Sequence, residues 1–461
     1  MTPVFSWLIT IVLTLVWVAT GHASSETTKP ELSDAPTCIA IVGSNDLHGQ
    51  LEPESQRAGN YEVRRGGLLG FSGYLNVIRE QFGDRVLILD AGDLMHGTYT
   101  ANHGRGAAMI AGLNQLGFHA STIGNHEFDY GPRTPDAADR IGVLKDRIAE
   151  ASFPFLGANI TDRKTGSPID WPNTRGSLIT ELGNVRVGII GLATPNTPQT
   201  TRPQNVTTLA FESPKQVVLK QARQLRRDGA QLIVVLAHLG AKCEDLSDPN
   251  NLESCDSRGG LIELLNALPR GVVDIAIGGH THSLAAHWIN GVATLESGHR
   301  GRYFGWLKAC VAPSGGLDRI HSTIHAPVAT CLETWADGTC TPVEQATEVL
   351  PAEYLGHPVV VSTELQETLA PFIDAARQSR EKVLPIELTR DLKRKTQQKI
   401  EDGFPNDSLG DIVAEGMRKA VNADVGIQNR GGVRADLPKG ALTFGQVYRV
   451  LPFGNHITTM Q

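Results

Sequence analysis

Short apolar or β-branched runs that end abruptly in polar residues recur along the chain. They occupy residues 38–43, 86–89, 120–123, 232–236 and 273–277. Continuous runs of this length are typical of strands buried in a sheet. Helix-like stretches lie between them, at residues 70–82, 107–116, 214–228 and 260–268. Strands that alternate with helices predict an α/β core.

Each of these runs is followed by Asp, Asn or His. In an α/β sheet the ligand site forms beyond the carboxyl ends of the strands, so we expect these side chains to converge. The candidates are Asp46, His48, Asp93, Asn125, His238, His280 and His282. The run at 185–191 is also typical of a strand, but Leu192-Ala-Thr-Pro195 after it carries no residue of the ligand type.

Taken singly, each candidate has an ordinary explanation. A lone Asp after a strand commonly caps a helix, a lone Asn is common in turns, and a lone His is often a hydrogen-bonded polar residue. Together they form an oxygen and imidazole set without thiolates, which suits Zn, Mn, Fe or Co. Seven ligands exceed the needs of one tetrahedral ion, so the set predicts two divalent metal ions with a shared carboxylate. Metal pairs about 3.5–4 Å apart catalyse phosphoryl displacement.

The order of the motifs resembles that of a known family. Ser44-Asn-Asp-Leu-His-Gly49, Gly92-Asp93, Gly124-Asn-His-Glu-Phe-Asp129, Ala237-His238 and Gly279-His-Thr-His282 follow one another as in calcineurin-like metallophosphatases. The Asn-Asp-x-His-Gly form and the C-terminal segment are similar to the 5'-nucleotidase/UDP-sugar hydrolase branch. The resemblance implies an α/β (α+β) fold with a four-layer αββα metallophosphatase sandwich. A linker helix and a partial α/β C-terminal substrate-binding domain would follow it.

The chain is expected to divide in the same way. The predicted parts are a signal peptide (1–24), a catalytic domain (36–345), a linker helix (360–383) and the C-terminal domain (384–461). The linker prediction also has support from the residues themselves. Apolar positions recur at helical spacing between Thr363 and Lys382, at Leu365, Leu369, Phe372, Ile373 and Ala376.

The resemblance also implies a role for each residue of the motifs. One metal would be held by Asp46, His48 and His282. The other would be held by Asn125, His238 and His280, with Asp93 bridging the two. His126 would stabilise the transferring phosphoryl group and the leaving oxygen, while Asp129 would orient His126. A metal-activated hydroxide would attack phosphorus in line. Among the remaining histidines, His96 and His299 lie beside motifs.

Two motifs near the C-terminus resemble the family's nucleotide-recognition loops. Asn429-Arg-Gly-Gly-Val-Arg434 would place Asn429 and Arg434 against the substrate, with the guanidinium on its phosphate. Leu451-Pro-Phe-Gly454 would stack Phe453 on the base. The alternatives are an ordinary glycine-rich turn and a core phenylalanine. Residues 402–410 carry no Arg where the family often has one, and the family continues beyond Gln461, so we expect this domain to be partial.

Composition and charge limit the cellular compartments and the classes of binding partner that we expect. The net charge of −7 gives no basic footprint for a nucleic acid polymer, so an anionic small molecule must meet local positive charge. Residues 4–18 are almost entirely apolar and are followed by a small-residue stretch up to Ser25, which predicts a cleaved signal peptide. An uncleaved anchor is the alternative. We expect a secreted or periplasmic protein without stable membrane insertion after signal cleavage.

The six cysteines all lie beyond the predicted signal peptide. An even count in that context suggests disulfides, with buried free thiols as the alternative. Local spacing favours Cys243–Cys255 and Cys331–Cys340, which would leave Cys38–Cys310.

The resulting hypothesis is a dinuclear-metal phosphoesterase that hydrolyses nucleoside 5'-phosphates, with UDP-sugars, nucleoside di- and triphosphates or 2',3'-cyclic nucleotides as neighbouring substrates. One alternative is the related thiosulfohydrolase of sulfur oxidation, which the Asn-Arg-Gly-Gly-Val-Arg loop disfavours. The other is a catalytically impaired nucleotide-binding relative, which the intact ligand set disfavours.

Overall fold

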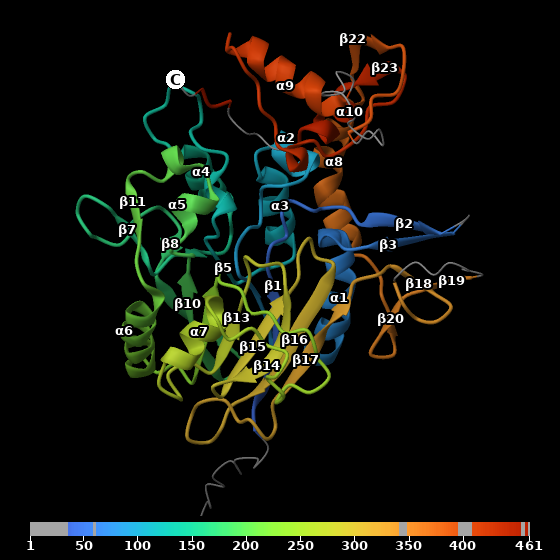
Figure 1. Ribbon diagram of the computed structural model, residues 1–461. Helices are drawn as coiled ribbons and strands as arrows, with labels where there is room; N and C mark the ends of the chain where they lie inside the picture. The colour runs from blue at the N-terminus through green and yellow to red at the C-terminus, as the bar shows by residue number, and fades with distance from the viewer. Residues whose placement is uncertain (1–35, 59–60, 341–347, 395–407, 453–456, 460–461) are drawn as a thin grey trace, which may run out of the picture. The chain divides into compact units, whose positions relative to one another are not determined.

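The computed structural model describes residues 36–58, 61–340, 348–394, 408–452 and 457–459 (Figure 1). The predicted signal peptide (1–24) and Phe453 lie outside these residues. Within the described ranges, no helix combines the length and the apolar character needed to cross a membrane.

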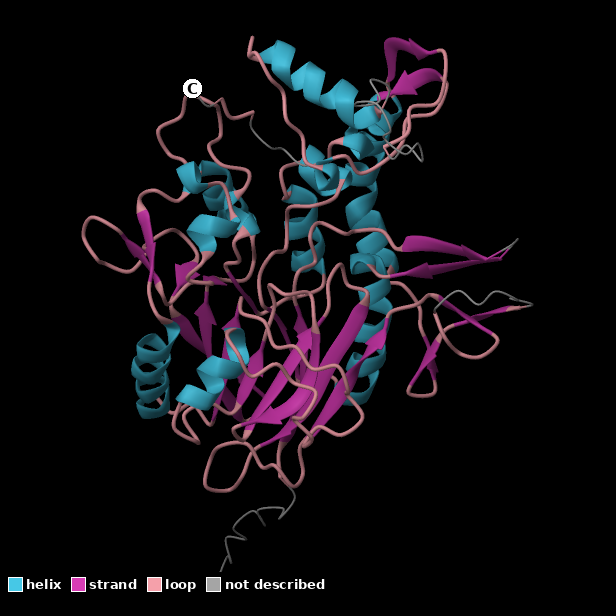
Figure 2. Ribbon diagram, in the orientation of Figure 1, coloured by secondary structure: helices cyan, strands magenta, loops and turns pink. Residues whose placement is uncertain are grey.

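Two sheets, formed from the apolar runs, make the centre of the fold (Figure 2). The seven-stranded sheet has the order β17 (Thr323–Ala329), β16 (Tyr303–Cys310), β1 (Cys38–Ser44), β4 (Val86–Asp90), β5 (Ala120–Thr122), β6 (Phe155–Leu156) and β8 (Thr174–Arg175). The six-stranded sheet has the order β14 (Leu284–Ile289), β15 (Val292–Ser297), β13 (Ile275–Ile277), β12 (Leu232–Ala237), β10 (Val185–Leu192) and β9 (Ser177–Leu182). Strands β1, β4 and β5 are parallel in the first sheet, and β10, β12 and β13 are parallel in the second.

The sheets and their helices stack in four layers. Ile41 of β1, Val234 of β12 and Ile277 of β13 belong to one buried cluster between the sheets. Helices α1 (Gly67–Phe82), α3 (Ala107–Gln115) and α4 (Gly142–Glu150) pack on the outer side of the seven-stranded sheet. Helices α6 (Pro214–Arg227) and α7 (Gly260–Ala267) pack on the outer side of the six-stranded sheet. The predicted αββα sandwich is therefore confirmed.

Short elements surround this sandwich. Helices α2 (Tyr99–His103) and α5 (Thr197–Thr200) and the 3-10 turns η1 (His126–Phe128) and η2 (Pro203–Asn205) lie in loops that follow strands. Four two-stranded sheets pair β2 (Glu54–Ala58) with β3 (Tyr61–Arg65), β7 (Ile160–Asp162) with β11 (Leu209–Phe211), β18 (Glu333–Trp335) with β19 (Val349–Pro351), and β20 (Glu353–Tyr354) with β21 (His357–Pro358).

The C-terminal part begins with a long helix, as its apolar spacing predicts. Helix α8 (Thr363–Glu381) is capped by Ser362, and its Leu365 and Leu369 are buried against the catalytic core. Beyond it lie β22 (Val383–Leu388), α9 (Leu409–Ala420), η3 (Arg430–Gly432), β23 (Gly440–Thr443) and α10 (Phe444–Val450). These elements share a small core of their own, formed by Leu392, Leu409, Val433, Leu437, Leu442 and Val450.

The two disulfides that local spacing favours and the third that remains are all present. Cys243 is bonded to Cys255 and Cys331 to Cys340. Cys38 is bonded to Cys310, its register partner across strands β1 and β16. The disulfide alternative is confirmed over free thiols.

The two sheets approach each other closely at Gly191 of β10. A Cβ atom built on Gly191 would come within 2.9 Å of the Leu156 carbonyl oxygen on β6. We expect Gly191→Ala to lower the free energy of unfolding by about 1–3 kcal/mol, because a tightly packed interface must move apart. Chemical denaturation of both proteins measures this difference.

Gly70→Ala in α1 is the matched control, because the nearest atom to its added Cβ, the Thr330 carbonyl oxygen, lies 3.8 Å away. Removing a helical glycine should stabilise the protein by roughly 0.5–1 kcal/mol. A Gly191→Ala variant as stable as the parent would contradict the close approach.

Candidate metal centre and catalytic pocket

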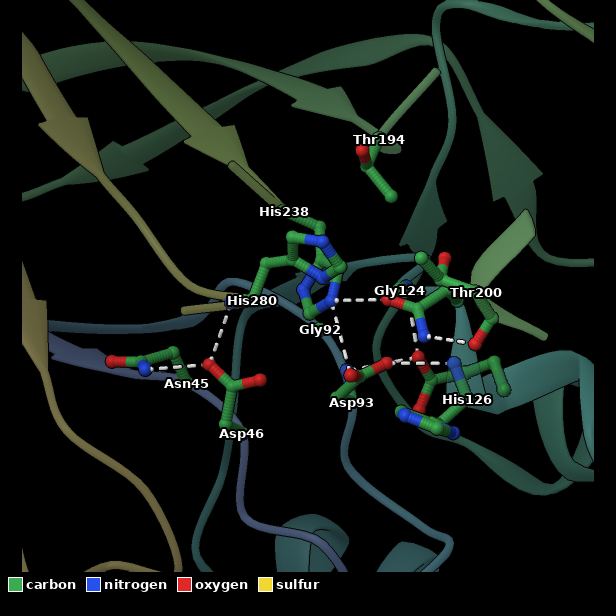
Figure 3. A network of polar contacts seen from close by, with 12 residues as sticks. Asn45, Asp46, Gly92, Asp93, Gly124, His126, Thr194, Thr200, His238 and His280 are labelled. Carbon is green, nitrogen blue, oxygen red and sulfur yellow. Dashed lines mark hydrogen bonds and ion pairs between the residues drawn. The ribbon is translucent and has the colours of Figure 1, made fainter. Parts of the chain in front are cut away.

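The seven candidate ligands follow the carboxyl ends of parallel strands from both sheets. Figure 3 labels four of them, Asp46, Asp93, His238 and His280. The loops after β1, β4 and β5 contribute the residues up to Asn125, and the loops after β12 and β13 contribute His238, His280 and His282. Direct hydrogen bonds join the two sheets here. His238 Nδ1 is 2.8 Å from the Ala91 carbonyl oxygen, and the His280 backbone N–H donates to Asp46 Oδ2 at 2.8 Å.

The first cluster consists of Asp46, His48 and His282. The Nε2 atoms of the two histidines lie 2.9 Å apart, and His282 Nε2 is 3.4 Å from Asp46 Oδ1. His48 Nδ1 lies 3.0 Å from the His96 carbonyl oxygen, a contact that holds the proton on Nδ1 and leaves Nε2 as a lone pair. Asp46 is fully buried, yet among the described residues its Oδ1 has no hydrogen-bond partner. Such an arrangement fits a cation between these atoms.

The second cluster surrounds His238, which is fully buried. Its Nε2 lies 3.0 Å from Asp93 Oδ2 and 3.0 Å from Asn125 Oδ1. His280 contributes a ring nitrogen to the same group as Asp93 and His238, within 4.8 Å of their ligand atoms. The structure thus brings together both predicted ligand groups. Their donors are carboxylate, amide and imidazole atoms, which fit divalent ions of the Zn or Mn type.

The backbone at the ligands is unusual. Asp46, His48, Asp93, His280 and His282 have φ angles of 50°, 47°, 58°, 77° and 58°. Residues with a Cβ rarely adopt this left-handed region, and each such residue costs on the order of 1–3 kcal/mol. The surrounding structure must therefore hold these loops in place.

Buried carboxyl groups supply that support. Glu127 accepts backbone hydrogen bonds from Asp93, Leu94 and Gly124, and so joins the loops after β4 and β5. Burial raises the pKa of Glu127 to about 7. All three backbone N–H groups donate to the two carboxyl oxygens of Glu127. The ionised form, which only accepts hydrogen bonds, is therefore the form that the loops require.

Glu296 supports the ligand loops of the six-stranded sheet in the same way as Glu127 supports those of the seven-stranded sheet. It is fully buried on β15 and accepts hydrogen bonds from the Ala241 and Ser283 backbone and from Thr281 Oγ1. It thereby joins the loops after β12 and β13, and burial raises its pKa to about 8. Sequence reasoning missed Glu296, because a glutamate within a strand gives no sign that it points at a neighbouring loop.

His126 and Asp129 form the predicted pair. His126 Nδ1 lies 2.6 Å from Asp129 Oδ2, and Thr201 Oγ1 donates to Asp129 Oδ1 at 2.7 Å. Burial lowers the pKa of His126, but the hydrogen bond to Asp129 and the charge of Asp93 outweigh it and raise the pKa to about 9. His96 Nδ1 is 3.4 Å from the same Asp129 oxygen, so His96 also belongs to this site.

A pocket of about 560 Å³ opens beside the two clusters. Its lining includes His48, His126, Asp129, His282, His299 and the predicted Arg434. Asn429 is exposed, accepts a hydrogen bond from Gln428 and does not line this pocket. Phe453 lies outside the described residues.

The loop after β10 also reaches the pocket, through Gln199, Thr200, Thr201 and Arg202. Sequence reasoning gave this strand end no role because it lacks Asp and His. The loop contacts the site through the Thr200 carbonyl oxygen and the Thr201 hydroxyl, and no motif distinguishes these from ordinary loop residues.

Family models match both parts of the chain. A model of calcineurin-like phosphoesterases matches residues 39–284, and a model of the 5'-nucleotidase C-terminal domain matches residues 379–461. The first covers the strands and loops that carry all seven candidate ligands.

Individual proteins resemble the chain over most of its length. Endonuclease YhcR of Bacillus subtilis is 25% identical over 443 residues, which cover 92% of this chain but 32% of that protein. Protein UshA of Escherichia coli is 24% identical over 467 residues, covering 96% of this chain and 77% of that protein. The crystal structure of a 5'-nucleotidase precursor from Thermus thermophilus aligns with a TM-score of 0.60 at 25% identity, covering 91% of this chain and 74% of that one.

The role of Glu296 can be tested through metal binding. In Glu296→Gln, an NH2 group replaces one carboxylate oxygen and faces an N–H or O–H donor, so a hydrogen bond to the loops is lost. The loop that carries His280 and His282 should therefore shift. We expect the affinity for Zn²⁺ or Mn²⁺ to fall about 10–100-fold, measured by calorimetry on metal-stripped protein. Glu253→Gln, on an exposed loop, is the control and should bind metal as the parent does. Equal affinities in the two variants would refute the role.

Proposed function

The chain belongs to the calcineurin-like phosphoesterase family of metal-dependent phosphoric ester hydrolases, and we propose that it hydrolyses nucleoside 5'-phosphates. One observation carries the choice of substrate. Arg434, from the segment that matches the 5'-nucleotidase C-terminal domain, lines the same pocket as His126 and His282. A guanidinium opposite a metal centre suits a phosphate group.

We further propose that the two clusters hold two divalent cations. Asp46, His48 and His282 would hold one, and Asn125, His238 and His280 the other. Asp93 would be the shared ligand, as the family resemblance implies, and its Oδ2 lies 3.0 Å from His238 Nε2 of the second cluster. When bound, such ions supply Lewis-acid stabilisation of phosphoryl oxygens and activation of water.

The protein's own groups would orient the substrate and handle the proton. His126 points its Nδ1 at Asp129, which leaves Nε2 for the pocket. When protonated, His126 can donate a hydrogen bond from Nε2 to a phosphoryl or leaving oxygen. Thr201 holds Asp129 from the other side, so the pair keeps one orientation.

An oxidising compartment is the proposed location. Three disulfides are typical of secreted and periplasmic proteins and are rare in the reducing cytosol. The substrate would then be a nucleotide outside the cytoplasm.

The deciding measurement is phosphate release from AMP by residues 25–461 after metal stripping. We expect activity to return when Mn²⁺ or Zn²⁺ is restored. Metal-dependent cleavage of p-nitrophenyl phosphate without cleavage of AMP would support the phosphoric ester hydrolase activity but contradict the proposal of a nucleotide substrate. If the metal-loaded protein cleaved neither substrate, the proposed activity would be contradicted.

His126→Ala tests the role of the histidine separately from metal binding. We expect turnover to fall about 10²–10⁴-fold, the usual contribution of a positioned acid or base, while metal content stays at the parent level. His321→Ala removes an exposed histidine that pairs with Asp318, and it should leave turnover unchanged. Full activity of His126→Ala would eliminate the proposed role.

A further inference from the structure

The loop after β10 is attached directly to the catalytic machinery. The Thr200 carbonyl oxygen accepts a hydrogen bond from Asn125 Nδ2 at 3.0 Å, and Thr201 Oγ1 donates to Asp129 Oδ1 at 2.7 Å. The loop therefore contacts a candidate metal ligand with one residue and the His126–Asp129 pair with the next. Figure 3 draws Thr200 among the polar contacts of the site.

The next residue, Arg202, is fixed by both of its neighbours. Its φ and ψ are −73° and 107°, an extended conformation that Pro203 favours, and it precedes the turn η2. Arg202 is half-buried and lines the pocket together with His48, His126 and Arg434.

Three arginines, Arg202, Arg300 and Arg434, line the pocket, and they come from different parts of the chain. Arg300 Nη1 donates to Glu54 Oε1 at 2.9 Å, so a carboxylate balances its charge. Arg434 comes from the C-terminal part and is exposed. Arg202 comes from the catalytic part, beside the residues that would act on the phosphoryl group. With a net charge of −7 over the chain, such local positive charge is what an anionic substrate needs.

We propose that Arg202 is a substrate-binding residue that contacts the phosphoryl group under attack. Its guanidinium would donate to non-bridging phosphoryl oxygens from the side of the loop after β10, with Arg434 on the C-terminal side. This proposal rests on the proposed phosphatase function but not on the identity of the leaving group. The loop keeps its place through Thr200 and Thr201, so a change at position 202 leaves those two hydrogen bonds intact.

The test compares Arg202→Ala, Arg202→Lys and the control Arg258→Ala in the metal-loaded protein. Arg258 lies on an exposed loop and pairs with Asp256. We expect Arg202→Ala to raise both KM for AMP and the inhibition constant of inorganic phosphate about 10–100-fold, the loss expected for a charge-assisted hydrogen bond. The effect on kcat should be smaller, and lysine should restore part of the phosphate affinity.

Inhibition by adenosine, which has no phosphate, separates binding from structural damage. It should be the same in Arg202→Ala as in the parent, and metal content should also match. Unchanged phosphate inhibition in Arg202→Ala would overturn the proposal, as would a parallel loss of adenosine and phosphate binding. If the parent cleaves only p-nitrophenyl phosphate, the nucleotide proposal fails, and the same comparison on that substrate still decides the role of Arg202.

Discussion

Ligand placement in this protein depends on buried carboxylates that accept hydrogen bonds from the backbone of the ligand loops. Glu127 joins two loops of the seven-stranded sheet, and Glu296 joins two loops of the six-stranded sheet. Asp90 has a related role, because it accepts from Gly92 N–H and from the hydroxyls of Ser44 and Ser121. A buried carboxylate without these donors would be strongly unfavourable, so loops and carboxylates stabilise each other.

This support explains how left-handed backbone persists at five of the seven candidate ligands. The strained conformations are confined to the ligand loops, whereas the strands that precede these loops, such as β4, β5, β12 and β13, are fully buried and hold the loop ends in place. His238 adds a link between the sheets through the Ala91 carbonyl oxygen. These hydrogen bonds position the ligand loops without any bound ion, and such preorganisation lowers the entropy lost on binding.

Much of this arrangement could be predicted from the sequence, for physical reasons. Parallel strands bring their carboxyl ends to one edge, so Asp46, Asp93 and His280 could be grouped from their places after apolar runs alone. The disulfides followed from spacing. The hydrogen-bond partners of Glu296 could not be predicted, nor could the contact of Thr201 with Asp129. Both depend on how the two sheets face each other. Asn429 is exposed and does not line the pocket, so its predicted contact with the substrate stays a prediction.

The bond between Cys38 and Cys310 has a further consequence. The two residues are 272 positions apart, and every candidate ligand, together with His126, Asp129 and Arg202, lies between them. The catalytic part is therefore a covalently closed ring, while Arg434 is on the tail outside it. A single proteolytic nick within the ring leaves the two pieces joined, so denaturing electrophoresis would reveal it only after reduction. A nick in the stretch between Cys310 and Cys331 would break the covalent link between metal ligands and Arg434 at once.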